Sequence, residues 1–483
     1  MALEWFLSLA GTEIANHPRL ATYLETVGSP LTSVGVCSCP TFTAELVGDA
    51  PYTTPAEDDA PWYDPDLPES GEFAGLLVLN VDGLDDHPVT RTSSSAAVGG
   101  AAIGPARAQA RTLTVTAVLL GSTCCGVTYG LKWLGEALAG CAGEGCGGDC
   151  LELFNCCPGE GAAADPEAFA ARHRRTLRRV SLISGPTPTS RVGGSCGGSG
   201  ECSGNDGEII TVEFVLSAAT PWLWTDPVPV LDVPVPTDDG TDCIVWCVHN
   251  PNAPEPPPPV CLELVEQTCT PPSVPVTFTD GDPTCDVAWS DEPVVPPCQT
   301  CRLAPCPTPE DLCRDDRCTI PAPPVPPPPQ TCWCRSLAVN TATYEVDLTT
   351  FPKWFGSAPM IEVRAGSQTL RRVTIKFFER TPAHEGLTCD EIVDLERCNP
   401  VATFEVAYVP RHGMLTLDGQ VGRAFVECPG SSGVTPDAYG PDGGPLTFPL
   451  LRCAKYCVLL EADAIFTPAD DAMVSIALSG REY

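Results

Sequence analysis

The stretch Arg111–Leu120 reads RTLTVTAVLL and alternates threonine with apolar residues along most of its length. Alternation with a period of two predicts a strand that is buried on one face only. A helix is expected shortly afterwards, at Leu131–Ala139, because Leu131, Leu134 and Leu138 recur on one helical face. This strand followed by a helix is the most informative local pattern in the chain and indicates a β domain that includes a helix.

Working outward, short apolar runs bounded by turn residues predict many further strands. The 53 prolines and 43 glycines also favour turns and strand edges over long helices. A short helix broken near Pro18 is predicted at Glu13–Leu24, and Asp418-Gly419 is a turn signal. The expected strands are Leu76–Val81, Leu177–Ile183, Ile209–Leu216, Met360–Val363, Val373–Phe378, Phe404–Val409, Met414–Leu417, Tyr456–Ala462 and Val474–Leu478. The fold class is therefore mostly β, with two domains of the sandwich type.

Changes in composition divide the chain into three parts. Residues 1–235 form the N-terminal domain, and residues 336–483 form a second β domain whose short strands suit a sandwich or jelly roll. Residues 236–335 have little periodicity and contain the proline runs Pro256–Pro259 and Pro326–Pro329 with eight cysteines between them. Such a segment cannot build a large core, so we interpret it as a cross-linked linker or arm.

The net charge of −35 comes from 62 acidic and 27 basic residues. A chain this acidic is not expected to bind nucleic acid by general electrostatics. The start of the chain lacks the basic region of a signal peptide, and no apolar run is long enough for membrane insertion. We therefore expect a soluble protein made in a cytosol.

The 28 cysteines conflict with a reducing cytosol, where disulfides are rare. Release from the cell without a signal, as when a virus particle escapes by lysis, allows the cysteines to oxidise later. Their spacings include Cys298 with Cys301, Cys332 with Cys334, and Cys453 with Cys457. Disulfides are the favoured interpretation, while free thiols and metal binding stay open, and no metal site is predicted because only one true CxxC occurs.

Three motifs that match catalytic or binding patterns by letter lack the required context. GxGxxG at 143–148 follows a helix rather than a strand, and GxSxG at 193–197 lies in a Gly/Ser loop. The Asp-Gly pairs at 238–240 and 280–282 do not complete a calcium loop and are interpreted as turns. The sequence therefore predicts no enzyme activity and no cofactor.

One dense basic cluster stands out in this acidic chain and consists of Arg172, Arg174, Arg175, Arg178 and Arg179. It is interpreted either as a solvated strand edge or as a contact with an acidic patch on a neighbouring subunit. A local positive patch in a strongly negative chain orients an oligomer, and contact with nucleic acid is the weakest alternative.

Several segments, taken in order, carry a resemblance to a known family. They are RTLTVTAVLLGSTCCGVTYGLKWLGEAL, SAATPWLW, TCWCRSL, APMIEVRAGSQTLRRVTIKFF, GMLTLDG, GRAFVECPG, LLRCAKYCVLLEAD and REY. In this order they resemble the minor tail proteins of long-tailed phages of actinobacteria, and more broadly distal tail proteins. The resemblance covers nearly the whole chain, and the order of the motifs is more specific than any one of them.

The resemblance implies a structural part of the virion at the tail tip. Distal tail proteins form a hexameric ring that joins the tail tube to the tail-tip hub and anchors adsorption proteins. Their N-terminal domain, with one helix and a β-hairpin, makes the ring, and a galectin-like sandwich faces outward. On this basis the arginine cluster, Leu131 and Trp133 are candidate ring contacts, and the long Cys/Pro segment departs from simpler members.

Two other functions compete with the structural role. The second β domain, with Trp354, Phe355 and Tyr439 as exposed contacts, is an alternative carbohydrate-binding adhesion module. A tail-associated enzyme is the third hypothesis, although the sequence contains no supported catalytic constellation. A galectin-like fold alone does not establish sugar binding.

Overall fold

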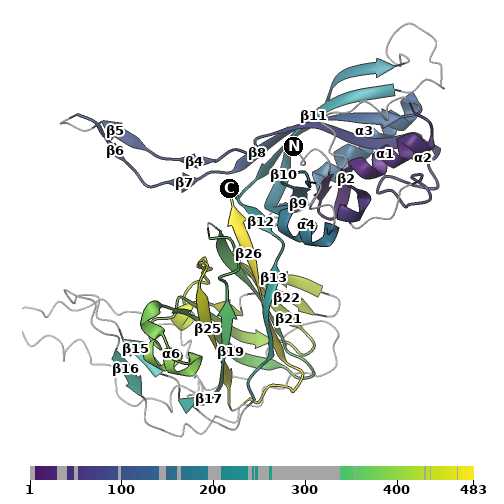
Figure 1. Ribbon diagram of the computed structural model, residues 1–483. Helices are drawn as coiled ribbons and strands as arrows, with labels where there is room; N and C mark the ends of the chain where they lie inside the picture. The colour runs from purple at the N-terminus through teal and green to yellow at the C-terminus, as the bar shows by residue number, and fades with distance from the viewer. Residues whose placement is uncertain are drawn as a thin grey trace, which may run out of the picture.

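The computed structural model describes residues 6–29, 41–47, 53–95, 99–140, 148–159, 165–193 and 208–237, short strands within 242–263, and 338–483 apart from 354, 429–430, 436 and 465. Its described part is mostly β, which confirms the expected fold class. An upper body, a lower sandwich and a thin projecting arm make up the molecule (Figure 1).

The upper body is a curved antiparallel sheet with helices packed on it. Its sheet runs β2-β1-β9-β10, and β10 continues through β11 and β8 to β3. The strands are β1 (Phe6–Leu9), β2 (Thr12–Asn16), β3 (Phe73–Asp82), β8 (Arg111–Gly121), β9 (Asp149–Phe154), β10 (Arg174–Gly193), β11 (Glu208–Ala218) and β12 (Leu223–Thr225). The helices are α1 (His17–Thr26), α2 (Pro68–Glu72), α3 (Cys124–Ala139) and α4 (Pro166–His173), with a 3₁₀ turn at Ala44–Val47.

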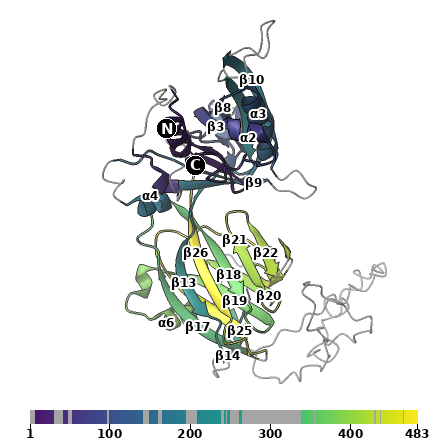
Figure 2. The same cartoon turned by 90° about the vertical axis from the view of Figure 1, so that its right-hand side faces the viewer.

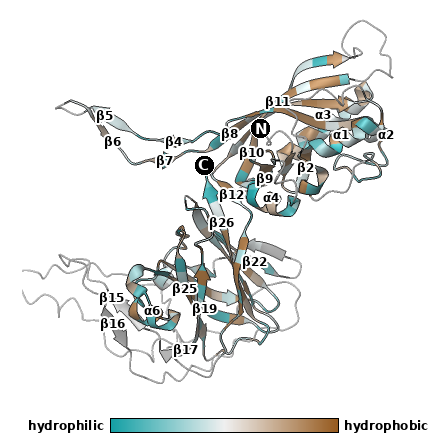
Figure 3. Cartoon of the chain, viewed as in Figure 1, coloured by the Kyte–Doolittle hydropathy of each residue, from teal (hydrophilic) through white to brown (hydrophobic). Residues whose placement is uncertain are grey.

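Strand β8 forms as the sequence predicts, whereas helix α3 ends at the predicted Ala139 but begins at Cys124, seven residues before the predicted Leu131. The apolar residues of β8 are buried in alternation, and Leu113, Val115 and Ala117 are at most 1% exposed. Helix α3 begins where the Thr123 side chain accepts a hydrogen bond from the Gly126 backbone N–H. Figure 3 shows hydrophobic residues concentrated in β11 and α3, whereas α2 is largely hydrophilic.

The helix predicted at Glu13–Leu24 is wrong in its first part, because Thr12–Asn16 forms strand β2 and the helix begins near Pro18 instead of breaking there. Helix α1 starts at His17, and the Asn16 side chain accepts a hydrogen bond of 3.2 Å from the backbone N–H of Arg19. Proline suits the first helical turn, where its missing N–H would have no partner within the helix.

The lower body is a β-sandwich. One sheet has the order β13-β26-β18-β21-β22-β23 and the other β14-β17-β25-β19-β20-β24. The strands of the first are β13 (Val228–Pro234), β26 (Met473–Glu482), β18 (Gly356–Arg364), β21 (Met414–Asp418), β22 (Arg423–Cys428) and β23 (Ser431–Val434). Those of the second are β14 (Asp242–Cys243), β17 (Ala338–Asp347), β25 (Lys455–Asp463), β19 (Leu370–Arg380), β20 (Ala402–Val409) and β24 (Ala438–Tyr439).

A hydrophobic core that includes Ile361, Phe377, Phe404, Val458 and Ile476 fills the space between the two sheets. Helix α6 (Cys389–Leu395) lies outside the second sheet, and 3₁₀ turns occur at Pro382–His384 and Pro441–Gly443. A separate pair joins β15 (Val245–Val248) to β16 (Val260–Glu263). Figure 2 shows the sandwich strands with β26 and β13 at the side that leads to the upper body.

Strand β12 makes the two bodies parts of one sheet. On one edge β12 pairs with β10, through Leu177↔Leu223, and on the other it pairs with β26, through Leu223↔Glu482. Strand β13 follows immediately and pairs with β26 from Val228↔Leu478 onward. The chain therefore enters the sandwich sheet before residue 235, and backbone hydrogen bonds cross the junction.

Candidate functional site

A long two-stranded arm leaves the upper body between β3 and β8. It contains β4 (Val89–Thr90) paired with β7 (Arg107–Ala108), and β5 (Ser93–Ser95) paired with β6 (Ala101–Ile103). Nearly all of its side chains are exposed, and Ile103 is 69% exposed. Figure 1 shows the arm projecting well away from both bodies. Since an isolated hairpin is marginally stable in water, this geometry suits contact with another protein.

Arg111 anchors the root of the arm. Its side chain is 1% exposed and donates to the carbonyl oxygens of Pro221 at 2.9 Å and Gly83 at 3.0 Å, and to that of Leu84. Burial lowers the pKa of Arg111, opposed by the charges of nearby carboxylates. From the sequence, Arg111 is recognisable only as the start of a strand, because its carbonyl partners are distant in the sequence.

Aromatic residues link the arm to the end of the sandwich strand β26. The ring centroid of His87, near the arm root, lies 3.7 Å from that of Tyr483. The ring centroid of Trp222 lies 4.4 Å from that of the same tyrosine. The guanidinium of Arg481 lies 3.9 Å above the Trp222 ring. The arm root, the upper body and the sandwich therefore meet at one place.

The arginine cluster lies where α4 turns into β10, and two of its members, Arg175 and Arg178, face the junction. Arg175 is 4% exposed and forms an ion pair with Glu482. Arg178 forms an ion pair of 2.7 Å with Asp418, which lies at the end of β21 in the sandwich. These two arginines therefore bind carboxylates of the same chain, a role that the sequence analysis did not consider.

The other members of the cluster occupy different surroundings. Arg174 lies 3.9 Å from Asp226, and burial raises the pKa of Asp226 while Arg174 opposes that shift. Arg172 is exposed at the end of α4, and Arg179 adopts a positive φ of 59°. Arg172 is thus the most accessible member for a contact with a neighbouring subunit.

The helix candidates Leu131 and Trp133 are half-buried against the core of the upper body. The Trp133 ring lies 5.4 Å from Trp62 and 6.1 Å from Phe73. Part of each side chain thus contributes to packing within the chain, and the remaining surface is what a ring contact would use.

The structure gives the bonding state of some of the cysteines. A disulfide joins Cys389 of α6 to Cys457 of β25, which confirms that disulfides form. Cys453 is a free thiol whose sulfur lies 3.6 Å from the Thr349 carbonyl oxygen. Cys124, Cys157 and Cys398 are disulfide-bonded as well. The candidates Cys298, Cys301, Cys332 and Cys334 lie outside the described residues.

A cysteine and a histidine lie within hydrogen-bonding distance of each other in the upper body. Cys156 Sγ lies 2.9 Å from Nδ1 of His173, and Asn155 Oδ1 lies 3.1 Å from the same nitrogen. Burial raises the pKa of Cys156 and lowers that of His173. Both shifts favour the neutral pair, whereas nucleophilic catalysis by cysteine requires the thiolate.

Several sequence hypotheses fall outside the described part of the chain. They are most of GxGxxG and GxSxG, both Asp-Gly pairs, the two proline runs and Trp354. Of the other proposed sugar contacts, Phe355 lies beside Gly480 and Tyr439 is half-buried in β24. Over the described ranges, His, Cys, Asp and Glu do not gather in groups of three that fit a metal ion. Among those same ranges, every helix is too short or too polar to cross a bilayer.

Comparison with solved structures finds a weak likeness to a phage protein. No protein-family model and no curated protein matches the chain. The crystal structure of the Dit protein of phage SPP1, described as a paradigm of the hub adsorption apparatus in phages that infect Gram-positive bacteria, matches with a TM-score of 0.32 and 11% identity. The match covers 86% of this chain and 96% of that chain, but a TM-score this low does not establish a common fold.

Proposed function

We propose that this protein is a non-enzymatic structural component of a phage tail tip. In this role, several copies form a ring, with six expected from the family resemblance, at the distal end of the tail tube. The ring joins the tube to the tail-tip hub and to other minor tail proteins. The protein would then be located in the virion after synthesis in the host cytoplasm.

The projecting arm is the observation that carries this proposal. Its strands bury little surface within their own chain, so the arm gains stability only by contacting something else. A ring requires a contact between two different surfaces of identical subunits that closes on itself. An arm that reaches beyond its own body provides such a head-to-tail contact.

The junction also supports a load-transmitting role. Because β12 pairs with β10 and β26, the upper body and the sandwich share one hydrogen-bonded sheet. Two ion pairs, Arg175–Glu482 and Arg178–Asp418, cross the same boundary. A part that transmits force between tube and hub benefits from such a continuous connection.

Removal of the arm tests the proposal directly. The backbone N–H of Gln109 donates to the Pro88 carbonyl at 2.8 Å, so Asn-Gly can replace residues 89–108 as a tight turn. The oligomer mass from light scattering and the particles seen by negative-stain electron microscopy are compared with those of the unchanged protein. We expect closed rings from the unchanged protein and monomers from the shortened one.

Two point variants sharpen the result. Ile103→Asp keeps the arm but places a charge at an exposed apolar position, and it should also weaken the ring. Arg364→Asp, at an exposed position of the sandwich, is the matched control and should leave the rings intact. Rings that persist without the arm would show that another surface makes the contact, and an unchanged protein that stays monomeric would overturn the proposal.

The arginine cluster is tested separately. Charge reversal at Arg174 and Arg175 should reduce ring assembly if the cluster contacts a neighbour, but Arg175 also stabilises the junction. Arg172→Glu separates these effects, because Arg172 is exposed and its Nε donates a hydrogen bond to the Ala168 carbonyl oxygen within α4. If Arg172→Glu leaves the rings unchanged, Arg172 lies on a solvated surface and makes no contact with a neighbouring subunit.

A further inference from the structure

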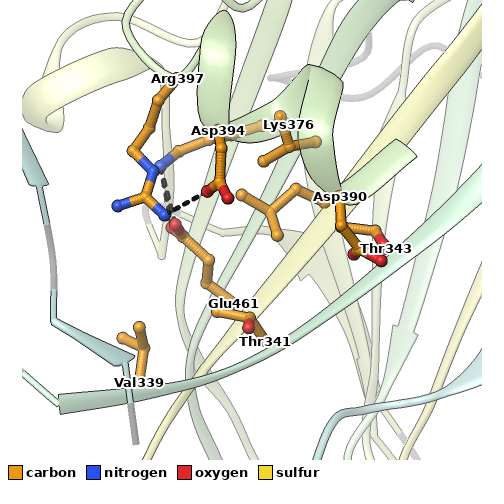
Figure 4. A pocket seen from close by; sticks show the side chains of 10 residues that line it. Val339, Thr341, Thr343, Lys376, Asp390, Asp394, Arg397 and Glu461 are labelled. Carbon is orange, nitrogen blue, oxygen red and sulfur yellow. Dashed lines mark hydrogen bonds and ion pairs between the residues drawn. The ribbon is translucent and has the colours of Figure 1, made fainter. Parts of the chain in front are cut away.

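A small depression lies on the outer face of the sandwich, between helix α6 and the sheet formed by β17, β25 and β19. Its volume is about 170 Å³, below the roughly 300–1,000 Å³ that drug-sized ligands occupy. Figure 4 shows that Lys376, Glu461, Asp394 and Arg397 point toward one another on one side, while Asp390 and Thr343 lie on the other. The cavity therefore has room for one small ligand.

Sheet register explains why these residues share a face. Leu459 of β25 lies between Thr343 of β17 and Lys376 of β19, and Glu461 is the next outward residue of β25. Side chains alternate across a strand, so Leu460 of β25 points to the opposite face, into the core. The sheet thus supplies an apolar floor at Leu459, with the ion pair between Lys376 and Glu461 beside it.

Helix α6 is held firmly as the second wall. The Cys389–Cys457 disulfide joins it to β25, and its residues Ile392 and Val393 pack with Phe378 in a small buried cluster. The helix begins with a capping box in which Thr388 and Glu391 exchange hydrogen bonds. The walls of the depression are therefore preformed, and a ligand would not need to order them.

The charges that line the depression are paired. Lys376 Nζ lies 3.0 and 2.9 Å from the two carboxylate oxygens of Glu461, and the two side chains are only 19% and 16% exposed. Arg397 lies 2.7 Å from Asp394, and Thr343 donates a hydrogen bond to Asp390. Three carboxylates repel an anion, and the two cations repel a metal ion, so neither kind of ion fits well.

A neutral ligand with several hydroxyl groups does fit. An ammonium has three N–H donors and a carboxylate has two oxygens, so the paired groups keep hydrogen-bonding capacity for a ligand. Hydroxyl groups donate to the carboxylates and accept from Lys376 and Arg397. The apolar floor, formed by Leu459 and Val393, suits the C–H face of a sugar ring.

We propose that this depression binds one sugar residue of a neutral glycan. Lys376 and Glu461 hold two hydroxyl groups at the floor, while Asp394 and Arg397 hold others from the rim. The site differs from the aromatic contacts expected from sequence, none of which lines it. It is independent of the arm, so its failure would leave the proposed ring function untouched.

The probes are methyl glycosides of glucose, galactose, mannose and rhamnose, tested on the full chain by saturation-transfer-difference NMR. The ligand efficiency usual for small ligands gives a dissociation constant on the order of 1 mM. Phosphate and calcium chloride serve as charged probes in parallel titrations. At least one glycoside should saturate, and neither ion should displace it.

Variants then locate the binding. Lys376→Met with Glu461→Leu removes both partners, so no buried charge is left unpaired, and it should weaken binding at least about tenfold. Asp394→Asn, at a side chain that is 68% exposed, should weaken binding with no loss of folding. The matched control is Arg364→Met with Glu362→Leu, an exposed ion pair on the other sheet, which should bind as the unchanged protein does.

Each outcome decides the proposal. Binding that is lost in the first double variant and in Asp394→Asn, but kept in the control, supports it. Absence of binding by every glycoside, or equal binding in all variants, overturns it. Saturable binding of phosphate or calcium at this site would overturn the assignment to a neutral ligand.

Discussion

The ion pair between Arg175 and Glu482 should be a large contributor to the stability of the junction. Its side chains are only 4% and 12% exposed, and they join β10 of the upper body to β26 of the sandwich. Arg175 also donates to the carbonyl oxygens of Arg172 at 2.6 Å and Arg174 at 2.8 Å. Substitution of one partner leaves the other charge buried without its counter-charge.

The expected cost follows from this burial. Removal of one partner from a buried pair typically destabilises by about 3–5 kcal/mol. Glu482→Gln should lie near the lower end of that range, because an amide keeps the shape of the carboxylate. Arg175→Met should lie near the upper end, since two carbonyl oxygens also lose their donor. The double variant should cost less than the sum, with a coupling energy of about 2 kcal/mol.

Chemical denaturation of the four proteins, followed by tryptophan fluorescence, measures these free energies. Trp224 is 2% exposed in β12 and reports on the junction itself. The exposed pair Arg364–Glu362 is the control, and substitution there should cost less than about 1 kcal/mol. A coupling energy for Arg175 and Glu482 no larger than that of the control would refute this account of the junction.

Three further predictions concern the disulfide, pH and the arm root. The double variant Cys389→Ala with Cys457→Ala removes a disulfide that closes a loop with a sequence separation of 68. It should lower the free energy of unfolding, measured by calorimetry, by about 4 kcal/mol. An unchanged melting temperature would contradict this prediction. Burial lowers the pKa of His17 to about 4, below its ordinary 6.5, so the unfolded chain binds more protons between these values. Stability should therefore fall as the pH drops from about 6.5 to about 4, and His17→Gln should flatten that slope in denaturation curves at several pH values. At the arm root, Gly83 has a φ of +93°, and an added Cβ would meet a backbone carbonyl oxygen of β8. Gly83→Ala should therefore lower the melting temperature by several degrees. The control Gly99→Ala, with a similar φ of +89° and open space around it, should lower the melting temperature less.

Local patterns predicted the regular elements well where alternation was strong. The nine expected strands all coincide with observed strands, and several extend beyond the predicted ends. Strand β10 begins at Arg174 and runs to Gly193 despite Pro186 and Pro188, which the pattern could not accommodate. Its long partner β11 pairs with it along most of that length, and such pairing overrides local preference.

Other features left no local signal. The arm strands contain mainly serine, alanine and threonine, without alternation between apolar and polar residues, so nothing marked them as strands. The carbonyl partners of Arg111 come from the arm root and from Pro221. Sequence alone could therefore identify neither the arm nor the residue that anchors it.

By itself, the sequence determined the mostly-β class, the second half of helix α3 and the approximate positions of the strands, because these depend on periodicity within about ten residues. Only the tertiary structure decided what Arg175 and Arg178 bind. Arg175 meets Glu482 across a sequence separation of 307, and Arg178 meets Asp418 across 240. Pairing between residues so far apart depends on how strands are ordered in a sheet, and that order follows from burying both cores at once rather than from any local pattern.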